Sequence, residues 1–130
     1  MAHPNEELAR EGIAAFQRGD LEALQSKYFA DDIRYHVPGR SPVAGTYEGP
    51  AQVISLFVRF FELTGGTLSI GAHDVVAGDE HAVALLTTRA ERNGKRLDGN
   101  EALICHIQEG KFAEIWTQPS DQYAADEFWS

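Results

Sequence analysis

Three turn signals divide the stretch from Thr67 to Pro119 into four segments in which apolar and polar residues alternate: Gly78-Asp79, Asn93-Gly94 and Glu109-Gly110. Alternation with a period of two is typical of β-strands, and short glycine-containing turns between such segments are typical of hairpins. This part of the chain is therefore predicted to form four consecutive antiparallel strands.

Before residue 67 the pattern favours helices. Apolar residues recur at helical spacing from Pro4 to Gly19, and again after Asp20, which can cap a short helix that ends at Asp31-Asp32. Pro50 suits the first turn of a third helix, whose wide apolar face predicts deep burial and which Gly65-Gly66 terminates.

The remaining segments are short. Ile33 to Val37 is predicted to be a strand, the Pro38-Gly39 turn closes it, and the residues from Arg40 to Gly49 are predicted to form an irregular loop. The tail from Ser120 to Ser130 ends in aromatic residues that are expected to dock on the rest of the chain. Because no repeat or linker interrupts residues 1–130, they are predicted to form one α+β domain with three N-terminal helices on a mainly antiparallel sheet.

Charge and cysteine content exclude several classes of partner and site. The 20 acidic residues outnumber the 11 basic ones and leave a formal charge of -9, which argues against nucleic acid as a partner. Cys105 is the only cysteine, so an intrachain disulfide and a multi-thiolate zinc site are excluded, and a cytoplasmic location is expected. No cationic, apolar leader or membrane-spanning run of about 20 residues is present.

The first hairpin fixes which side chains share a face. A two-residue type I′ turn at Asn93-Gly94 places Arg92 opposite Lys95 and Leu86 opposite Glu101. One face of the sheet then carries Glu101 as its only charge. Its predicted members are Ala84, Leu86, Thr88, Ala90, Leu97, Gly99, Glu101, Leu103, Cys105, Ile107, Ala113, Ile115, Thr117 and Pro119.

The second hairpin allows two registers. A type I turn with Gly110 in a bulge position places Leu103 opposite Ile115, which is the preferred reading. A strict two-residue turn at Glu109-Gly110 instead flips the last strand and moves Trp116 and Gln118 to the helix side. In the preferred reading the outer face is too apolar to be fully solvated, so we expect a second copy to cover it through Ile104, Phe112 and Trp116.

Five short motifs resemble those of the NTF2-like superfamily, and specifically its SnoaL-like branch, which is related to the ketosteroid isomerases. They are Gly19-Asp20-Leu21-Glu22-Ala23-Leu24, Phe29-Ala30-Asp31-Asp32, His36-Val37-Pro38-Gly39, Gly45-Thr46-Tyr47-Glu48-Gly49 and Glu109-Gly110-Lys111-Phe112. The resemblance implies a cone, in which a curved sheet wraps around the helices and encloses a mostly apolar pocket, and often a dimer through the sheet.

The same resemblance argues against two known chemistries of the superfamily. The positions of the oxyanion tyrosine, the proton-shuttling aspartate and the protonated aspartate of the ketosteroid isomerases hold Gly12, Val37 and Leu103. The aspartates of the epoxide-hydrolase-like members correspond to Thr117 and to a position on the strand of Leu86. None of these residues is a carboxylate, so neither mechanism is expected here.

Glu101 is the strongest candidate for chemistry. A carboxylate alone among apolar residues has a raised pKa and can act as a general acid or base near neutrality. The alternative is that the strand bulges near Gly99-Asn100 and turns Glu101 to solvent.

His36 and Arg40 lie where the first strand enters the loop expected to rim the pocket, close to Tyr35 and Tyr47. His36 can transfer a proton and the others can polarise an oxygen, although a histidine beside a Pro-Gly turn more often binds the loop backbone. Strand alternation also sends one member of the pair His73-Asp74 inward, without deciding which.

The sequence therefore predicts a protein that binds a small hydrophobic molecule in an apolar cone pocket, with cofactor-free proton transfer of the isomerase, cyclase or dehydratase type. The alternative is a non-catalytic binding or interaction module. The histidines have no paired metal-ligand spacing and no phosphate loop follows a strand, so no metal and no cofactor are expected. The residues expected to line the pocket are Phe16, Tyr35, Tyr47, Phe57, Phe60, Leu86, Thr88, Leu103, Cys105, Ile115 and Thr117.

Overall fold

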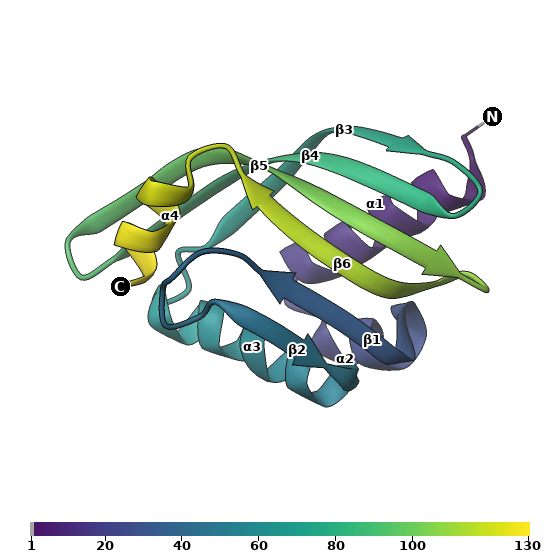
Figure 1. Cartoon of the computed structure of the whole chain (residues 1–130), viewed down its shortest axis with the longest axis horizontal. Helices are drawn as coiled ribbons and strands as arrows, with labels where there is room; N and C mark the ends of the chain where they lie inside the picture. Colours follow the sequence, from purple (N-terminus) through teal and green to yellow (C-terminus); the bar gives the residue numbers. More distant parts are fainter. Residues whose placement is uncertain (1) are drawn as a thin grey trace.

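The computed structural model describes residues 2–130 as a curved sheet that bends around two helices (Figure 1). The elements follow in the order α1 (Pro4–Gln17), α2 (Leu21–Ala23), the π-helical turn η1 (Leu24–Tyr28), β1 (Phe29–Val37), β2 (Gly45–Glu48), α3 (Gly49–Leu63), β3 (Ser69–Ala77), β4 (His81–Arg92), β5 (Lys95–Gln108), β6 (Lys111–Pro119) and α4 (Gln122–Trp129). The α+β cone predicted from the sequence is confirmed.

Local side chains explain where the helices start. His3 accepts a hydrogen bond from the backbone of Asn5 ahead of Pro4, and Asp20 caps α2 by accepting one from the Ala23 N–H at 3.1 Å. The second helix is shorter than predicted, because η1 ends at Tyr28 and β1 begins at the next residue, before Asp31. A fourth helix, α4, forms in the tail, where Asp121 accepts a hydrogen bond from the Ala124 N–H at 3.1 Å.

The six strands are arranged in the order β2-β1-β6-β5-β4-β3, and only the pair of β1 with β6 is parallel. The four-strand meander predicted from the turn signals is confirmed. The segment from Arg40 to Gly49 was expected to be irregular throughout, but residues 45–48 form β2 by pairing with β1. No described helix has the length and apolar character needed to cross a membrane.

The register between β4 and β5 is the predicted one. Asn93 and Gly94 both have positive φ, as a type I′ turn requires, and the ladder runs without a break from Arg92 opposite Lys95 to Leu86 opposite Glu101. Because no bulge interrupts this ladder at Gly99 or Asn100, Glu101 is not turned to the outer face.

The predicted register between β5 and β6 is wrong. Glu109 and Gly110 form a two-residue turn in which both have positive φ, and Leu103 pairs with Thr117 instead of Ile115. A bulge on β6, between the residues that pair with Ile107 and His106, then inserts one extra residue. Beyond this bulge, Ile115 and Thr117 face inward, as in the predicted register. Trp116 and Gln118 therefore stay on the outer face.

Phe112 is the residue that the two-residue turn relocates, because it lies before the bulge and pairs with the inward-facing Ile107. It was predicted on the outer face, but it is 4% exposed and belongs to the core. The Cβ of any side chain at position 12 would lie 2.8 Å from the Phe112 ring, so Gly12 allows α1 to approach this ring closely. Phe112 therefore cannot contribute to an outer interface.

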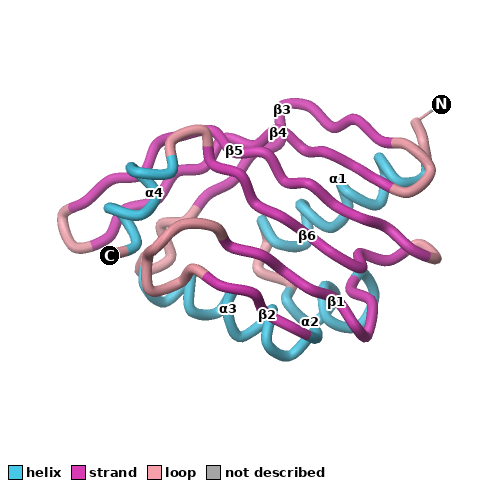
Figure 2. The backbone as a smooth tube through the Cα atoms, viewed as in Figure 1, coloured by secondary structure: helices cyan, strands magenta, loops and turns pink. Residues whose placement is uncertain are grey.

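The helices cover only the inner face of the sheet. Helix α1 packs against β3 and β4, α3 packs against β1 and β2, and the strands form a continuous band on one side of both helices (Figure 2). Helix α4 lies at the end of the sheet where the β4–β5 hairpin projects (Figure 1). Its Phe128 is 1% exposed, which confirms that the tail docks, whereas Tyr123 is 90% exposed.

Candidate functional site

A cavity of about 420 Å³ lies between the inner face of the sheet and the helices. This volume is in the range typical of small-molecule sites. Helices α1 and α3 form one wall, β4, β5 and β6 form the other, and α4 contributes residues at the mouth. Most of the lining side chains are apolar, so the cavity suits a molecule with a largely apolar body.

An aromatic cluster forms the helix-side wall. Phe57 on α3 lies at its centre, with its ring centroid 5.0 Å from that of Phe16 and 5.3 Å from that of Tyr35. The Phe29 and Phe60 rings lie at 6.1 and 6.3 Å from Phe57. These offset and edge-to-face contacts hold the wall rigidly and present ring faces and edges to a ligand.

Three polar side chains on the sheet share the inner part of the cavity: Glu101 on β5, Thr88 on β4 and Tyr35 on β1. None of the ion pairs formed by residues 2–130 includes Glu101. Burial raises the pKa of the Glu101 carboxyl, and the nearby Thr88 hydroxyl, which favours the charged form, offsets part of this rise. Glu101 is thus a half-buried carboxylate at the cavity, without a counterion among the described residues.

Tyr35 and Thr88 complete the polar cluster around Glu101. Burial, followed by the charges of Glu101 and Cys105, raises the pKa of the Tyr35 phenol well above its ordinary value, so Tyr35 remains a neutral hydrogen-bond donor. The Thr88 hydroxyl is buried and has no hydrogen-bond partner of ordinary geometry within residues 2–130. A buried hydroxyl without a partner is costly, and a ligand in the cavity can supply one.

Cys105 contributes shape rather than reactivity. Burial raises the pKa of its thiol to about 12, and the side chain is 1% exposed. Because the thiolate is the nucleophilic form, this thiol is unreactive near neutral pH.

Helix α4 closes the mouth of the cavity by bridging two loops. Arg92 and Lys95, at the tip of the β4–β5 hairpin, donate hydrogen bonds to the carbonyls of Phe128 and Glu127 at 3.1 and 2.8 Å. At the other end, Asp126 accepts a hydrogen bond from the Arg40 backbone N–H at 3.1 Å. The loop after β1 can approach α4 this closely because a glycine, at position 39, leaves room beside Gln122 and Asp126.

The structure brings most of the sequence-predicted site residues together. Eleven of the thirteen line the cavity, namely Phe16, Tyr35, Phe57, Phe60, Leu86, Thr88, Glu101, Leu103, Cys105, Ile115 and Thr117. His36 and Tyr47 do not.

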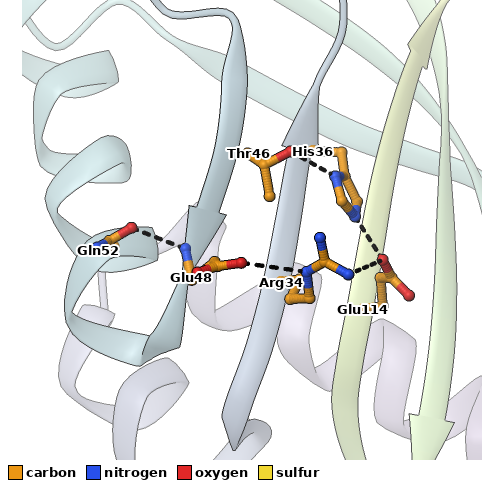
Figure 3. Close-up of polar contacts among 6 residues, drawn as sticks. All are labelled: Arg34, His36, Thr46, Glu48, Gln52 and Glu114. Atoms are coloured by element: carbon orange, nitrogen blue, oxygen red, sulfur yellow. Dashed lines mark hydrogen bonds and ion pairs between the residues drawn. The ribbon is translucent and has the colours of Figure 1, made fainter.

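His36 lies on the outer face of the sheet, away from the cavity (Figure 3). Its Nε2 lies 2.5 Å from the Glu114 carboxylate, its Nδ1 lies 2.9 Å from the Thr46 hydroxyl, and its ring stacks on Trp116. Arg34 extends this network from Glu114 to Glu48. His36 cannot reach a ligand in the cavity, because consecutive residues of a strand point to opposite faces and Tyr35 takes the inner one.

Four other residues also lie apart from their expected positions. The Tyr47 hydroxyl donates a hydrogen bond to the Val43 carbonyl at 2.7 Å and so stabilises the loop. Arg40 has an exposed side chain and contacts α4 through its backbone. A bulge in β3 at His73 leaves both His73 and Asp74 exposed, so neither of this pair points inward.

Sequence reasoning missed cavity residues that come from three sources. Residues of α1, such as Ile13, had a helical pattern that predicted burial but not contact with a cavity. Phe112 enters because the two-residue turn pairs it with Ile107, and Trp129 enters because α4 folds over the mouth and its ring lies 4.9 Å from Phe60. The sequence showed the apolar face of the first helix, the alternative two-residue turn and the aromatic tail, but not that these residues would meet at a cavity.

Gly12, Val37 and Leu103, which the sequence resemblance matched to catalytic positions of the ketosteroid isomerases, line the cavity. Within residues 2–130, no group of three or more histidine, cysteine, aspartate or glutamate side chains is placed to hold a metal ion. The carboxylates that line the cavity are Glu101 on the middle of β5 and Asp98, Asp121 and Asp126, of which Asp121 and Asp126 belong to the α4 region.

Comparisons with known proteins agree with this architecture. The uncharacterised protein Rv0034 of Mycobacterium tuberculosis is 32% identical over 125 residues, which is 95% of each chain. The structure of Bal32a, from a soil-derived mobile gene cassette, is 34% identical, covers 98% of this chain and 97% of that one, and superposes with a TM-score of 0.94. An NTF2-like protein from Burkholderia xenovorans shares the fold at 23% identity, with coverages of 98% and 96% and a TM-score of 0.80.

The profile of one protein family also matches most of the chain. The family is described as the SnoaL-like domain, and the match runs over residues 9–115. It includes the C-terminal part of α1, the aromatic wall, Glu101 and the bulged part of β6. The chain therefore belongs to the SnoaL-like family, with an NTF2-like fold.

Proposed function

We propose that this protein binds a small, mostly apolar molecule in its cavity and catalyses a cofactor-free proton transfer on it, with Glu101 as the group that moves the proton. The observation that carries the proposal is the position of Glu101, a carboxylate without a counterion in an otherwise apolar interior. A buried carboxylate whose pKa is raised is a stronger base than one in water, and it can also act as an acid closer to neutral pH.

The reaction can be written as a balanced proton shuttle. The Glu101 carboxylate accepts a proton from a carbon next to a carbonyl group, and the electrons of the broken C–H bond move onto the carbonyl oxygen. The neutral Tyr35 hydroxyl donates a hydrogen bond to this oxygen as its negative charge grows. Glu101 then returns the proton to another atom of the same molecule and is ionised again.

The test uses 2-tetralone, a two-ring ketone with acidic C–H groups beside its carbonyl, in D₂O. The wild-type protein is expected to accelerate exchange of these hydrogens for deuterium above the buffer rate, as followed by NMR. Glu101→Gln keeps the size of the side chain but removes the base, and is expected to lower the protein-catalysed rate about a hundredfold. Glu114→Gln removes the same charge from the outer face and is expected to leave the rate unchanged.

A second candidate function is non-catalytic ligand binding. It is favoured by the apolar residues that replace the known catalytic groups of related enzymes at Gly12, Val37 and Leu103. Binding of 2-tetralone without accelerated exchange would support this function, and equal exchange by the wild type and Glu101→Gln would remove Glu101 from the reaction. Native mass spectrometry of the purified protein would identify any small molecule retained in the cavity.

We also propose that a second copy of the chain covers the outer face of the sheet. Leu85 is 40% exposed there, next to the half-buried side chains of Ile104 and Trp116. The same face carries both signs of charge in Arg34 and Glu114, so two copies related by a two-fold axis need not repel each other.

The oligomeric state in solution tests this interface. Wild-type protein at tens of micromolar is expected to have the mass of a dimer in light scattering, and Leu85→Asp is expected to run as a folded monomer, because two unpaired carboxylates would be buried at the two-fold interface. Tyr123→Asp, which introduces the same group at an exposed site on α4, is the control and is expected to remain dimeric. A monomeric wild type, or a dimeric Leu85→Asp, would show that this face is not the interface.

A further inference from the structure

The polar groups in the inner part of the cavity restrict the chemistry of the ligand. They are the Glu101 carboxyl, the Tyr35 hydroxyl and the Thr88 hydroxyl, and they come from three different strands. We infer that the natural ligand is an uncharged ring compound that buries a hydroxyl group, phenolic or enolic, against these three side chains. The inference rests on the proposed function, because it assigns the substrate class of the same site.

The hydrogen-bonding capacity of the three groups supports a hydroxyl. Tyr35 has a donor to offer, and the buried Thr88 hydroxyl, which lies beside Glu101 but has no hydrogen-bond partner of ordinary geometry within residues 2–130, can donate or accept. Glu101 accepts when it is ionised and donates when it is protonated. A ligand hydroxyl both donates and accepts, so it satisfies the cluster in either protonation state of Glu101. An ether only accepts.

The charges along the cavity argue against an acidic ligand. The lining contains no lysine and no histidine, and its only arginine is Arg96, an exposed residue of the β4–β5 hairpin. An anion in the inner part of the cavity would therefore meet the Glu101 carboxylate without a compensating cation. Burying such a like-charged pair is strongly unfavourable.

The energetics also disfavour a cationic ligand. An ammonium group beside Glu101 would form a buried ion pair and would require the carboxylate to be ionised in an apolar environment. Desolvation of both ions offsets much of the attraction in such pairs. A neutral hydroxyl forms its hydrogen bonds without this cost.

The side chains in the walls of the cavity indicate which kind of ring system the ligand contains. The rings of Phe16, Phe57 and Phe60 lie opposite the sheet and offer edges and faces to an apolar ring system. A naphthalene ring with one substituent is a probe that fits this description and allows the substituent to be changed alone.

The test compares four naphthalene derivatives at pH 6.5 by isothermal titration calorimetry. They are 2-naphthol, its methyl ether 2-methoxynaphthalene, the anion 2-naphthoate and the cation 2-naphthylmethylammonium. We expect 2-naphthol to bind about tenfold more tightly than the ether, which corresponds to one or two net hydrogen bonds. We expect 2-naphthoate and the ammonium compound to bind more weakly than the ether.

Two variants test whether the preference for 2-naphthol over its methyl ether depends on the polar side chains of Tyr35 and Thr88. Thr88→Val and Tyr35→Phe each remove one hydroxyl with little change in shape, and each is expected to lower the ratio of naphthol to ether affinity about threefold while the ether affinity stays constant. Thr87→Val makes the same chemical change one residue earlier, on the outer face of β4, and is expected to leave the ratio unchanged.

Several outcomes would overturn the inference. They are equal binding of 2-naphthol and its ether, tighter binding of the naphthoate or the ammonium compound, absence of binding by all four probes, or an unchanged ratio in both cluster variants. The proposed proton transfer fails separately, because it is judged from deuterium exchange and not from these affinities. A naphthol preference without exchange would leave a hydroxyl-selective binding protein.

Discussion

Replacing Phe57 with alanine is expected to lower the free energy of unfolding by about 3 kcal/mol or more. The side chain is 5% exposed and its ring lies at the centre of the aromatic cluster, with Phe16, Phe29, Tyr35 and Phe60 around it. Removal of the ring loses the stabilisation that comes from its buried apolar surface, and it leaves a void that the sheet and α1 fill only partly. A loss of this size is a large fraction of the 5–15 kcal/mol typical of a small domain.

Urea denaturation followed by circular dichroism measures the loss. Val58→Ala is the matched control because it lies next along α3 but is 39% exposed, and a change within roughly 0.5 kcal/mol is expected for it. A Phe57→Ala variant as stable as Val58→Ala would show that the aromatic cluster is not a stabilising core element.

Replacing Glu101 with glutamine is expected to make the protein relatively more stable as the pH rises from acidic to neutral values. Burial raises the folded-state pKa of Glu101 above its unfolded value of about 4.3. At pH values below the unfolded-state pKa, Glu101 is protonated in both the folded and the unfolded state, so its ionisation does not lower the stability of the wild type. Between the two pKa values the unfolded state releases its proton while the folded state retains it, so the wild type loses stability as the pH increases.

The magnitude follows from the size of the shift. Each unit by which the folded-state pKa is raised is worth about 1.4 kcal/mol once the pH exceeds the folded-state value. The difference in unfolding free energy between Glu101→Gln and the wild type should therefore increase with pH above about 4.3 and then level off at a constant value. Urea denaturation between pH 4 and 8 measures this curve, with Glu114→Gln as the control on the outer face. A difference independent of pH would show that Glu101 is not desolvated.

The parts of the fold that the sequence predicted are those governed by local rules. Asparagine and glycine tolerate the positive φ of a type I′ turn, so Asn93-Gly94 could determine the register of β4 and β5 and thereby the position of Glu101. The wide apolar face of α3 predicted deep burial for the same kind of reason, and this is correct only in part, because Phe57 is buried whereas Val58 is 39% exposed. Both features can be recognised within a few residues of the chain.

The errors arise where distant contacts decide the structure. Glutamate rarely adopts positive φ, yet Glu109 does so at φ 52°, and the resulting two-residue turn needs the β6 bulge to keep Ile115 and Thr117 inside. The inward position of Phe112 follows from the two-residue turn, which pairs it with Ile107, and from its contact with α1. Strand β2 is only four residues long and depends on its pairing with β1.

The position of His36 could have been predicted better. Tyr35 and His36 are adjacent in a strand, so only one of them can face the cavity, and the two could not both have been site residues as predicted. The outward direction of His36 is then reinforced by its contacts with Glu114 and Trp116. The role of α4 could not be predicted, because it depends on where the β4–β5 hairpin and the loop after β1 meet.

The attachment of α4 has a consequence for how ligand range can diverge among proteins with this architecture. Glu101 lies on β5, within the sheet. The mouth of the cavity, in contrast, is held by Phe128 of α4 and by a few polar contacts at the edge of the molecule. Substitutions in the tail or at the hairpin tip can therefore alter which molecules gain entry, and how quickly they leave, without disturbing the geometry around Glu101. The range of molecules that enter the cavity and the reactivity of Glu101 can therefore change independently of each other.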